Sequence, residues 1–212
     1  LLKTIGLMRS LSEIIQKTRP FAIFLENVDR LVTHDEGRTF RIIIDTLVKR
    51  LGYHIIGVEL REDGGLQYMP QNRPRTYIIG FDTERFSPEE LARLPHELPL
   101  NRANEIYHDL NDVLEHNVPA KYYMASGYLD TLIRHRARQE GKGYGFGYRI
   151  VNAEGIERPI ANTLLATGGS GRERNLIYDP QAGIAGQIIK GKKTPLNDKG
   201  IRVMTPSEWG KL

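Results

Sequence analysis

The stretch FAIFLENV, residues 21–28, decides how the first part of this chain is interpreted. Its five apolar residues, Phe21–Leu25, are typical of a strand buried on both faces. The polar residues Glu26 and Asn27 follow at once. Ligands of α/β sheets bind beyond the carboxyl ends of the strands, so these two residues are candidates for a binding site. A helix cap or a surface group is the commoner role of an acidic residue in this place.

The segments after this strand predict an α/β fold. Apolar periodicity predicts helices over residues 7–18 and 38–51, and apolar runs predict strands over 53–60 and 76–81. Pro20 ends the first helix and Gly52 the second. A helical crossover joins the strand 21–25 to the strand 53–60, so we expect these two strands to form a parallel pair.

A second polar motif, Gln71-Asn72-Arg73-Pro74-Arg75, precedes the strand predicted over 76–81. Arg73 and Arg75 are two residues apart on an extended segment, so their side chains are expected to point the same way. Two guanidinium groups there could hold a phosphate, a carboxylate or a base oxygen. A solvated strand edge is the alternative.

The chain changes character near Ser87. Residues 87–120 contain four prolines and are interpreted as a linker with short helices, and residues 121–139 predict a basic helix. Its arginines form either a phosphate-contact patch or a solvated helix face. In residues 141–148, glycines alternate with lysine and aromatic residues. This pattern fits either a hairpin with packed aromatics or a site where bases stack on the protein.

Composition excludes several classes of protein. The chain has 212 residues, 40% hydrophobic and 26% charged, which is typical of a globular protein. It has no apolar run near the roughly 20 residues of a membrane helix and no signal peptide, so we expect a cytoplasmic, bacterial protein without a membrane partner. It has no cysteine, which excludes disulfides, thiolate zinc sites and a cysteine nucleophile within the chain. The six histidines form no metal-binding pair, so no metal is expected.

The last residues predict the start of a helix. Thr205 suits the N-cap, Pro206 the first helical position, and Glu208 the third position of a capping box. The chain stops at Leu212, about two turns later. We therefore expect that the chain has been cut, with a frayed natural terminus as the alternative.

Four segments, taken in order, resemble the DNA (cytosine-5)-methyltransferase family. They are RPFAIFLENVDRLVTHDEGRTF (19–40), MPQNRPRTYIIGF (69–81), ERPIANTLLATGGSGRERNLI (157–177) and IRVMTPSEWGKL (201–212). The first carries the family's Glu-Asn-Val motif, and the second its Gln-x-Arg-x-Arg motif. The order of the four segments makes the resemblance specific, although each is weak alone.

The resemblance implies a role for each matching residue. Glu26 would contact the ring nitrogen and amino group of a flipped cytosine, and Asn27 would hold that loop. Arg75 would reach the cytosine oxygen, with support from Arg73. A carboxyl group donates to a ring nitrogen only when protonated, which burial favours. The implied catalytic residues are Glu26, Arg73 and Arg75, and the supporting residues are Asn27, Gln71 and Thr163.

The resemblance also implies a division of the chain. Residues 1–86 would be part of a Rossmann-like, S-adenosylmethionine-dependent methyltransferase sheet. Residues 87–157 would be a mixed target recognition domain that reads double-stranded DNA, and residues 158–212 would return to the catalytic domain. The implied DNA-binding residues are Arg134, Arg136, Arg138, Lys142, Tyr144, Gly168 and Gly169.

Three parts of the family pattern are absent: the catalytic cysteine loop, the Gly-rich cofactor loop and a downstream Gly-Asn-Ser-Val motif. The resemblance therefore implies that S-adenosylmethionine is bound mainly by missing segments, and no cofactor-binding residue is assigned. The chain could be an expressed fragment, part of a longer protein, or one subunit of a split enzyme. We expect that the parent protein methylates carbon 5 of cytosine in DNA and that this chain alone is inactive.

Two other hypotheses remain open. The first is a catalytically inactive DNA-binding subunit or regulatory partner of a methyltransferase, which the lack of cysteine favours. Such a subunit would pair with the missing N-terminal part or with a complementing subunit. The second is an unrelated α/β domain, which a structure without the parallel pair of 21–25 and 53–60 would favour.

Overall fold

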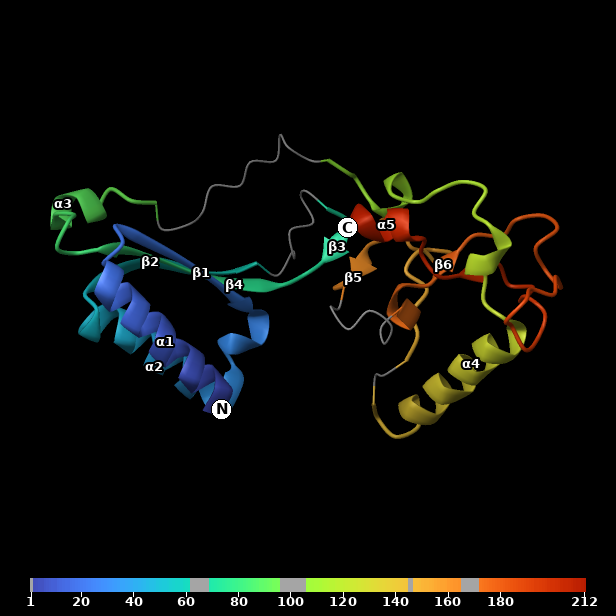
Figure 1. Ribbon diagram of the computed structural model, residues 1–212, viewed down its shortest axis with the longest axis horizontal. Coiled ribbons are helices and arrows are strands. Elements are labelled where there is room, and N and C mark those ends of the chain that lie inside the picture. Colours follow the sequence, from blue (N-terminus) through green and yellow to red (C-terminus); the bar gives the residue numbers. More distant parts are fainter. Residues whose placement is uncertain (1, 62–68, 96–105, 145–146, 165–171) are drawn as a thin grey trace. The chain divides into compact units, whose positions relative to one another are not determined.

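The computed structural model describes residues 2–61, 69–95, 106–144, 147–164 and 172–212 (Figure 1). The chain forms two compact units. Unit 1 comprises residues 1–64 and 74–101, and unit 2 comprises residues 65–73 and 102–212. The helices within the described ranges include none that is long and apolar enough to cross a membrane.

Unit 1 is built on a three-stranded sheet in the order β1-β4-β2. The strands are β1 (Ala22–Val28), β2 (Tyr53–Arg61) and β4 (Arg75–Asp82), and both outer strands pair antiparallel with β4. β1 and β2 therefore run in the same direction, but they are not paired with each other. The predicted parallel pair is wrong, because the strand after β2 inserts between them and supplies hydrogen bonds to both.

β1 also differs from the prediction in length and burial. The strand continues through Glu26 and Asn27 to Val28 instead of ending at Leu25. Only one of its faces is covered: Ile23 is buried, whereas the side chain of Phe24 is 61% exposed. Alternate residues of a strand point to opposite faces, so Phe24, Glu26 and Val28 share the open face.

Two helices cover the other face of this sheet (Figure 1). α1 spans Leu2–Thr18, and α2 spans Arg38–Asp45 and continues as a π-helical turn over Thr46–Arg50. Both predicted helices are confirmed, and Gly52 follows the second with φ +71°, as a helix terminator requires. α3 (Pro88–Leu91) is short and begins with a capping box at Ser87. The core between the helices and the sheet contains Ile15, Ile43, Leu47, Leu51, Ile23, Tyr53 and Ile78.

Unit 2 has little regular structure. β3 (Gln71–Asn72) pairs parallel with β5 (Ala161–Asn162), and β6 (Ile177–Tyr178) pairs antiparallel with β7 (Ile201–Arg202). Its helices are α4 (Ser126–Glu140) and α5 (Pro206–Gly210). The helix predicted over 121–139 begins later, at Ser126, because Tyr123 and Ala125 instead form β-bridges with Arg202 and Leu196.

A buried ion pair organises the centre of unit 2. The two outer guanidinium nitrogens of Arg202 each donate to one carboxylate oxygen of Glu208, both at 2.8 Å. The Nε of Arg202 donates to Asp179 Oδ2 at 2.7 Å. Glu208 also accepts from the backbone N–H groups of Thr205 and Glu115. The capping box predicted at Thr205 is therefore confirmed, and its glutamate has a second role that the sequence pattern did not reveal.

Candidate functional site

The open face of the unit 1 sheet places two predicted site residues together. Glu26 lies on β1 opposite Tyr77 of β4, and Arg75 lies one same-face position further along β4. This diagonal is within reach of long side chains. Arg75 Nε lies 2.5 Å from Glu26 Oε1. The side chain of Glu26 is 49% exposed, whereas that of Arg75 is 12% exposed. The face therefore offers an accessible carboxylate that a nearly buried cation holds in place.

The guanidinium of Arg75 is not fully satisfied. One outer nitrogen donates to the carbonyl of Pro74 at 2.7 Å. Its Nε is buried and has no aligned hydrogen-bond partner among the described residues, although it contacts Glu26. Buried donors without a partner are uncommon and call for a specific explanation. Here the carboxylate of Glu26 supplies the countercharge, although the two groups are not aligned for a hydrogen bond.

Aromatic side chains flank the pair on the same face. The rings of Phe24 and Tyr77 are stacked, with centroids 5.3 Å apart. Val28, next to Arg75 in the register, is 50% exposed. A flat apolar surface thus lies beside a carboxylate and a guanidinium. This arrangement can contact the face of a planar ring and bond to its polar edge.

Asn27 and residues His34–Thr39, which belong to the first of the four matching segments, have local roles. The side-chain oxygen of Asn27 accepts from the backbone N–H of Val28 at 2.8 Å. His34 Nδ1 lies 2.9 Å from Thr39 Oγ1, and Gly37 adopts φ +76° where α2 begins. Only glycine adopts such a φ without strain, so this motif is explained by the turn into α2. The supporting role of Asn27 stays a prediction.

Three further predicted residues belong to unit 2. Gln71 is buried, and its amide nitrogen donates to the carbonyl of Leu212 at 2.8 Å. Thr163 Oγ1 donates to the carbonyl of Asn72 at 2.6 Å and so ties the two short strands together. Arg73 is exposed. Gln71 and Thr163 hold the backbone next to the arginines, and the catalytic role of Arg73 stays a prediction.

The predicted DNA-contact residues cluster at the end of α4. Residues 134–138 are all exposed, so the last turns of this helix are largely open to solvent. Arg136 is engaged by Glu140, whose Oε1 lies 2.7 Å from its Nε. Arg138, Lys142 and Tyr144 are exposed. Gly168 and Gly169 lie outside the described residues.

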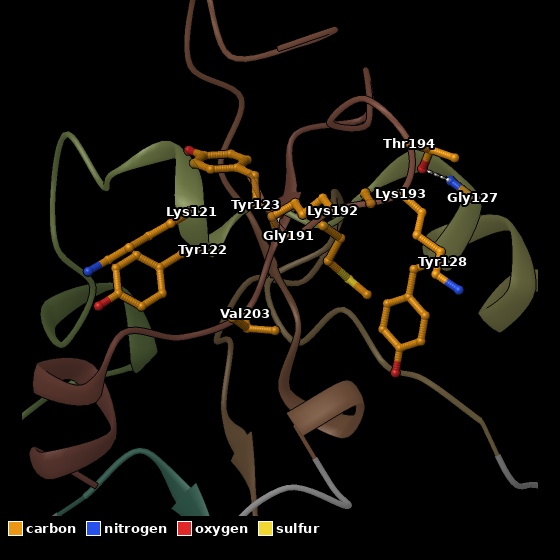
Figure 2. A pocket seen from close by; sticks show the side chains of 12 residues that line it. Lys121, Tyr122, Tyr123, Gly127, Tyr128, Gly191, Lys192, Lys193, Thr194 and Val203 are labelled. Carbon is orange, nitrogen blue, oxygen red and sulfur yellow. Dashed lines mark hydrogen bonds between the residues drawn. The ribbon is translucent and has the colours of Figure 1, made fainter. Parts of the chain in front are cut away.

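Unit 2 contains a hollow of about 640 Å³ beside the start of α4 (Figure 2). Lys121 and Tyr122 lie on one side of it, and Gly127 and Thr194 on the other, where the N–H of Gly127 donates to Thr194 Oγ1 at 2.9 Å. Lys192 Nζ donates to the carbonyl of Tyr123, and burial lowers the pKa of this lysine. These bonds hold the loop around Lys192 in place. The hollow has a basic lining that includes Lys121, Lys192 and Lys193.

A second hollow, of about 540 Å³, lies between the end of α4 and β5. Its lining contains three arginines, Arg136, Arg149 and Arg174, and one carboxylate, Glu140. No group of three or more metal-ligating side chains occurs in the part of the chain that the structure describes.

Comparison with known proteins gives a consistent result. Residues 3–212 match the family described as C-5 cytosine-specific DNA methylase. The type II methyltransferase M.HpaII of Haemophilus parainfluenzae is 38% identical over 95% of this chain and 52% of that protein. The type II methyltransferase M1.ScrFI of Lactococcus lactis subsp. cremoris is 35% identical over 74% of this chain and 37% of that protein.

The fold is similar to that of a solved methyltransferase. The structure of Entamoeba histolytica methyltransferase EhMeth superimposes with a TM-score of 0.50 over 89% of this chain and 49% of that chain, at 22% identity. This chain thus spans about half the length of the Haemophilus relative and of the solved structure.

Proposed function

The chain belongs to the family of C-5 cytosine-specific DNA methylases, and we propose that its parent protein transfers a methyl group to carbon 5 of a flipped cytosine in double-stranded DNA. The observation that carries the proposal is the Glu26–Arg75 pair on the open sheet face. A base inside a duplex cannot reach such a surface, so it has to leave the stack, at a cost of a few kcal/mol.

Each member of the pair has a role that its chemistry supports. When protonated, the carboxyl group of Glu26 donates to the ring nitrogen and accepts from the amino group of cytosine. The guanidinium group of Arg75 donates to the base oxygen. Because guanidinium stays charged at every physiological pH, that bond does not depend on proton transfer. Phe24 and Tyr77 support the proposal by offering a flat surface next to the pair.

We assign DNA contact to the basic end of α4 in unit 2. Arg138 and Lys142 are exposed there, and cations near the C-terminus of a helix are also favoured by its dipole. Such contacts bind phosphates and position the protein without reading the sequence. The role of residues 87–157 as a target recognition domain is part of this proposal.

The methyl donor S-adenosylmethionine does not fit either hollow of unit 2. The donor carries a sulfonium cation, whereas one hollow is lined by three lysines and the other by three arginines. Like charges at close range are unfavourable. We therefore place donor binding outside these two hollows, and none of their side chains is assigned a step that involves it.

The chain contains no cysteine, so it lacks the thiol that the family uses to attack cytosine. We propose that the nucleophile is supplied by another part of the protein, since the chain spans about half the length of its Haemophilus relative. The 212-residue chain is then inactive alone. A Rossmann-like sheet completed by that other part belongs to the same proposal.

The test is methyl transfer to duplex DNA by the parent protein, measured with a radiolabelled methyl donor. Glu26→Gln is expected to lower the rate about 100-fold or more, because an amide can hydrogen-bond to the ring nitrogen but cannot transfer a proton to it. Glu13→Gln is the matched control, since Glu13 is also an exposed glutamate paired with an arginine, Arg9. A parent protein that never labels cytosine would contradict the proposal, as would an unaffected Glu26→Gln variant.

The lack of cysteine favours one other function, that of a DNA-binding subunit without chemistry of its own. The two functions are distinguished by expressing this chain and an intact methyltransferase separately and then mixing them. A subunit of this kind would stimulate an intact methyltransferase, and Glu26→Gln would leave that stimulation unchanged.

A further inference from the structure

The hollow between the end of α4 and β5 has an excess of positive charge. Three guanidinium groups, those of Arg136, Arg149 and Arg174, line it together with the single carboxylate of Glu140. Only Arg136 is paired with that carboxylate. The lining therefore carries a net charge of about +2, and no acidic side chain is left to balance Arg149 and Arg174.

The guanidinium group of Arg136 already has two partners within the protein. Its guanidinium bonds to Glu140 at 2.7 Å and lies 5.5 Å above the ring centroid of Tyr148. Gly147 makes this possible, because a Cβ on that residue would lie 3.0 Å from Arg136 Cγ. The bond to Glu140 raises the pKa of Arg136, which therefore stays charged. The opposite charges of the two side chains offset each other. Arg136, one of the residues assigned to DNA from the sequence, is thus part of the wall.

Hydrogen bonds hold the two backbone segments that carry Arg149 and Arg174 together. The N–H of Arg149 donates to the carbonyl of Glu173 at 2.8 Å, and its carbonyl accepts from Leu176 at 2.9 Å. The carbonyl of Arg174 accepts from the side chain of Asn162 at 2.6 Å. Both side chains are exposed, and neither has a partner within the described ranges. Two free guanidinium groups thus project from a backbone that hydrogen bonds hold in place.

We infer that Arg149 and Arg174 form a clamp for a single phosphodiester group, which in this protein comes from the DNA backbone. The inference rests on the proposed DNA-binding function. Guanidinium groups bind phosphate oxygens in a forked geometry, and the single negative charge of a phosphodiester offsets part of the excess positive charge of the hollow. Arg136, Glu140 and Tyr148 form its wall and make no contact with the phosphate.

The first test uses the 212-residue chain and the dinucleotide TpT, which has one phosphodiester and no secondary structure. The Nε–Hε signals of Arg149 and Arg174 are followed by ¹H–¹⁵N NMR at low salt. Both signals are expected to shift with one common Kd, and that of Arg93, an exposed arginine of unit 1, to stay in place. The clamp would be overturned if the signals of Arg149 and Arg174 did not shift, or if the signal of Arg93 shifted equally.

The second test is duplex DNA binding as a function of salt. One phosphate contact contributes about 0.9 to the slope of log K against log salt. Arg149→Gln, Arg174→Gln and the double variant are each expected to lower the slope by about 0.9 and the affinity about tenfold, since both side chains hold one phosphate. Arg93→Gln is the control. An unchanged slope, or additive losses that sum to about 1.8, would contradict the clamp.

The two tests separate failure of the clamp from failure of the proposed function. A chain that binds TpT at this hollow but not duplex DNA retains the phosphodiester site and refutes DNA binding by unit 2. A chain that binds duplex DNA with an unaltered slope in the double variant retains the function and refutes the clamp.

Discussion

Two arginine–carboxylate pairs of this chain differ in burial and in the number of bonds they make. In the Arg202–Glu208 pair of unit 2, both side chains are at most 1% exposed. The carboxylate accepts two bonds from the guanidinium and two from backbone N–H groups. In the Glu26–Arg75 pair of unit 1, the carboxylate is 49% exposed and the guanidinium retains a donor without an aligned partner.

This difference indicates which pair serves the fold and which is available to a ligand. Removing one member of a buried pair leaves an uncompensated charge, so Arg202–Glu208 stabilises unit 2 as long as both residues are present. A pair with a half-exposed member contributes less to stability, because water solvates that member when its partner is removed. Glu26–Arg75 is therefore interpreted as part of a site, and the accessibility of the Glu26 carboxylate supports that interpretation.

Removal of Glu208 is expected to have the largest effect on stability. Glu208→Ala leaves the guanidinium of Arg202 buried without its main partner and removes the acceptor of the Thr205 N–H in the capping box of α5. The free energy of unfolding of unit 2 is expected to fall by about 3–5 kcal/mol. Urea denaturation followed by the fluorescence of Trp209, the single tryptophan, measures this. Glu154→Ala, at an exposed glutamate, is the control and should change nothing. A loss below about 1 kcal/mol would mean that the buried pair is not structural.

The Arg19–Asp82 pair of unit 1 lies between the other two pairs in burial. Asp82 is buried, and its oxygens accept from Arg19 at 3.0 and 2.7 Å and from the N–H of Glu84. Burial acts to raise the pKa of Asp82, but these bonds outweigh it, and the pKa is lowered. The carboxylate thus stabilises the fold fully above the unfolded pKa of about 3.9, and this contribution is lost as the pH falls through the folded value.

Acid denaturation followed by circular dichroism tests this assignment. Asp82→Asn is expected to cost about 1.5–3 kcal/mol at pH 7, the range for hydrogen bonds to charged groups. Its stability should also vary less than that of the wild type below about pH 4. Equal acid sensitivity of the two proteins would mean that other carboxylates control acid unfolding.

Loss of a single neutral hydrogen bond near the buried pair should cost less. The hydroxyl of Tyr123 donates to the carbonyl of Asp179 at 2.8 Å, and burial raises the pKa of this tyrosine, which keeps its proton. Tyr123→Phe is expected to lower the free energy of unfolding by about 1 kcal/mol in the same urea assay. Tyr122→Phe is the control, because no bond is described for its hydroxyl. Equal effects of the two variants would contradict a role for the bond.

The sequence predicts local features of this fold better than long-range ones. Apolar periodicity identified α1 and α2, and the Thr205–Glu208 spacing identified the capping box. The position of β4 between β1 and β2 could not be predicted, because strand order depends on contacts between distant residues. The exposure of Phe24 was missed for the same reason, since a continuous apolar run does not show which face is covered.

The site residues likewise divide into those that a local motif reveals and those that depend on long-range contacts. Glu26 and Arg75 were found from motifs, and the structure brings them together across the β1–β4 ladder. Arg202 was not found, since the capping pattern already accounted for Glu208. Arg149 and Arg174 were missed because they become neighbours only through hydrogen bonds between segments 25 residues apart. A search for arginines without nearby acidic residues could have suggested Arg149.

The smallest expected change in stability is at the site itself. Glu26→Gln removes the charge of a half-exposed carboxylate from a pair on the open face. The free energy of unfolding of the 212-residue chain should change by less than about 0.5 kcal/mol, because water solvates the half-exposed carboxylate and glutamine keeps an acceptor oxygen beside Arg75. The same substitution should abolish most methyl transfer by the parent protein. A loss of stability comparable to that of Glu208→Ala would show that Glu26 serves the fold, and the loss of activity would then carry no information about catalysis.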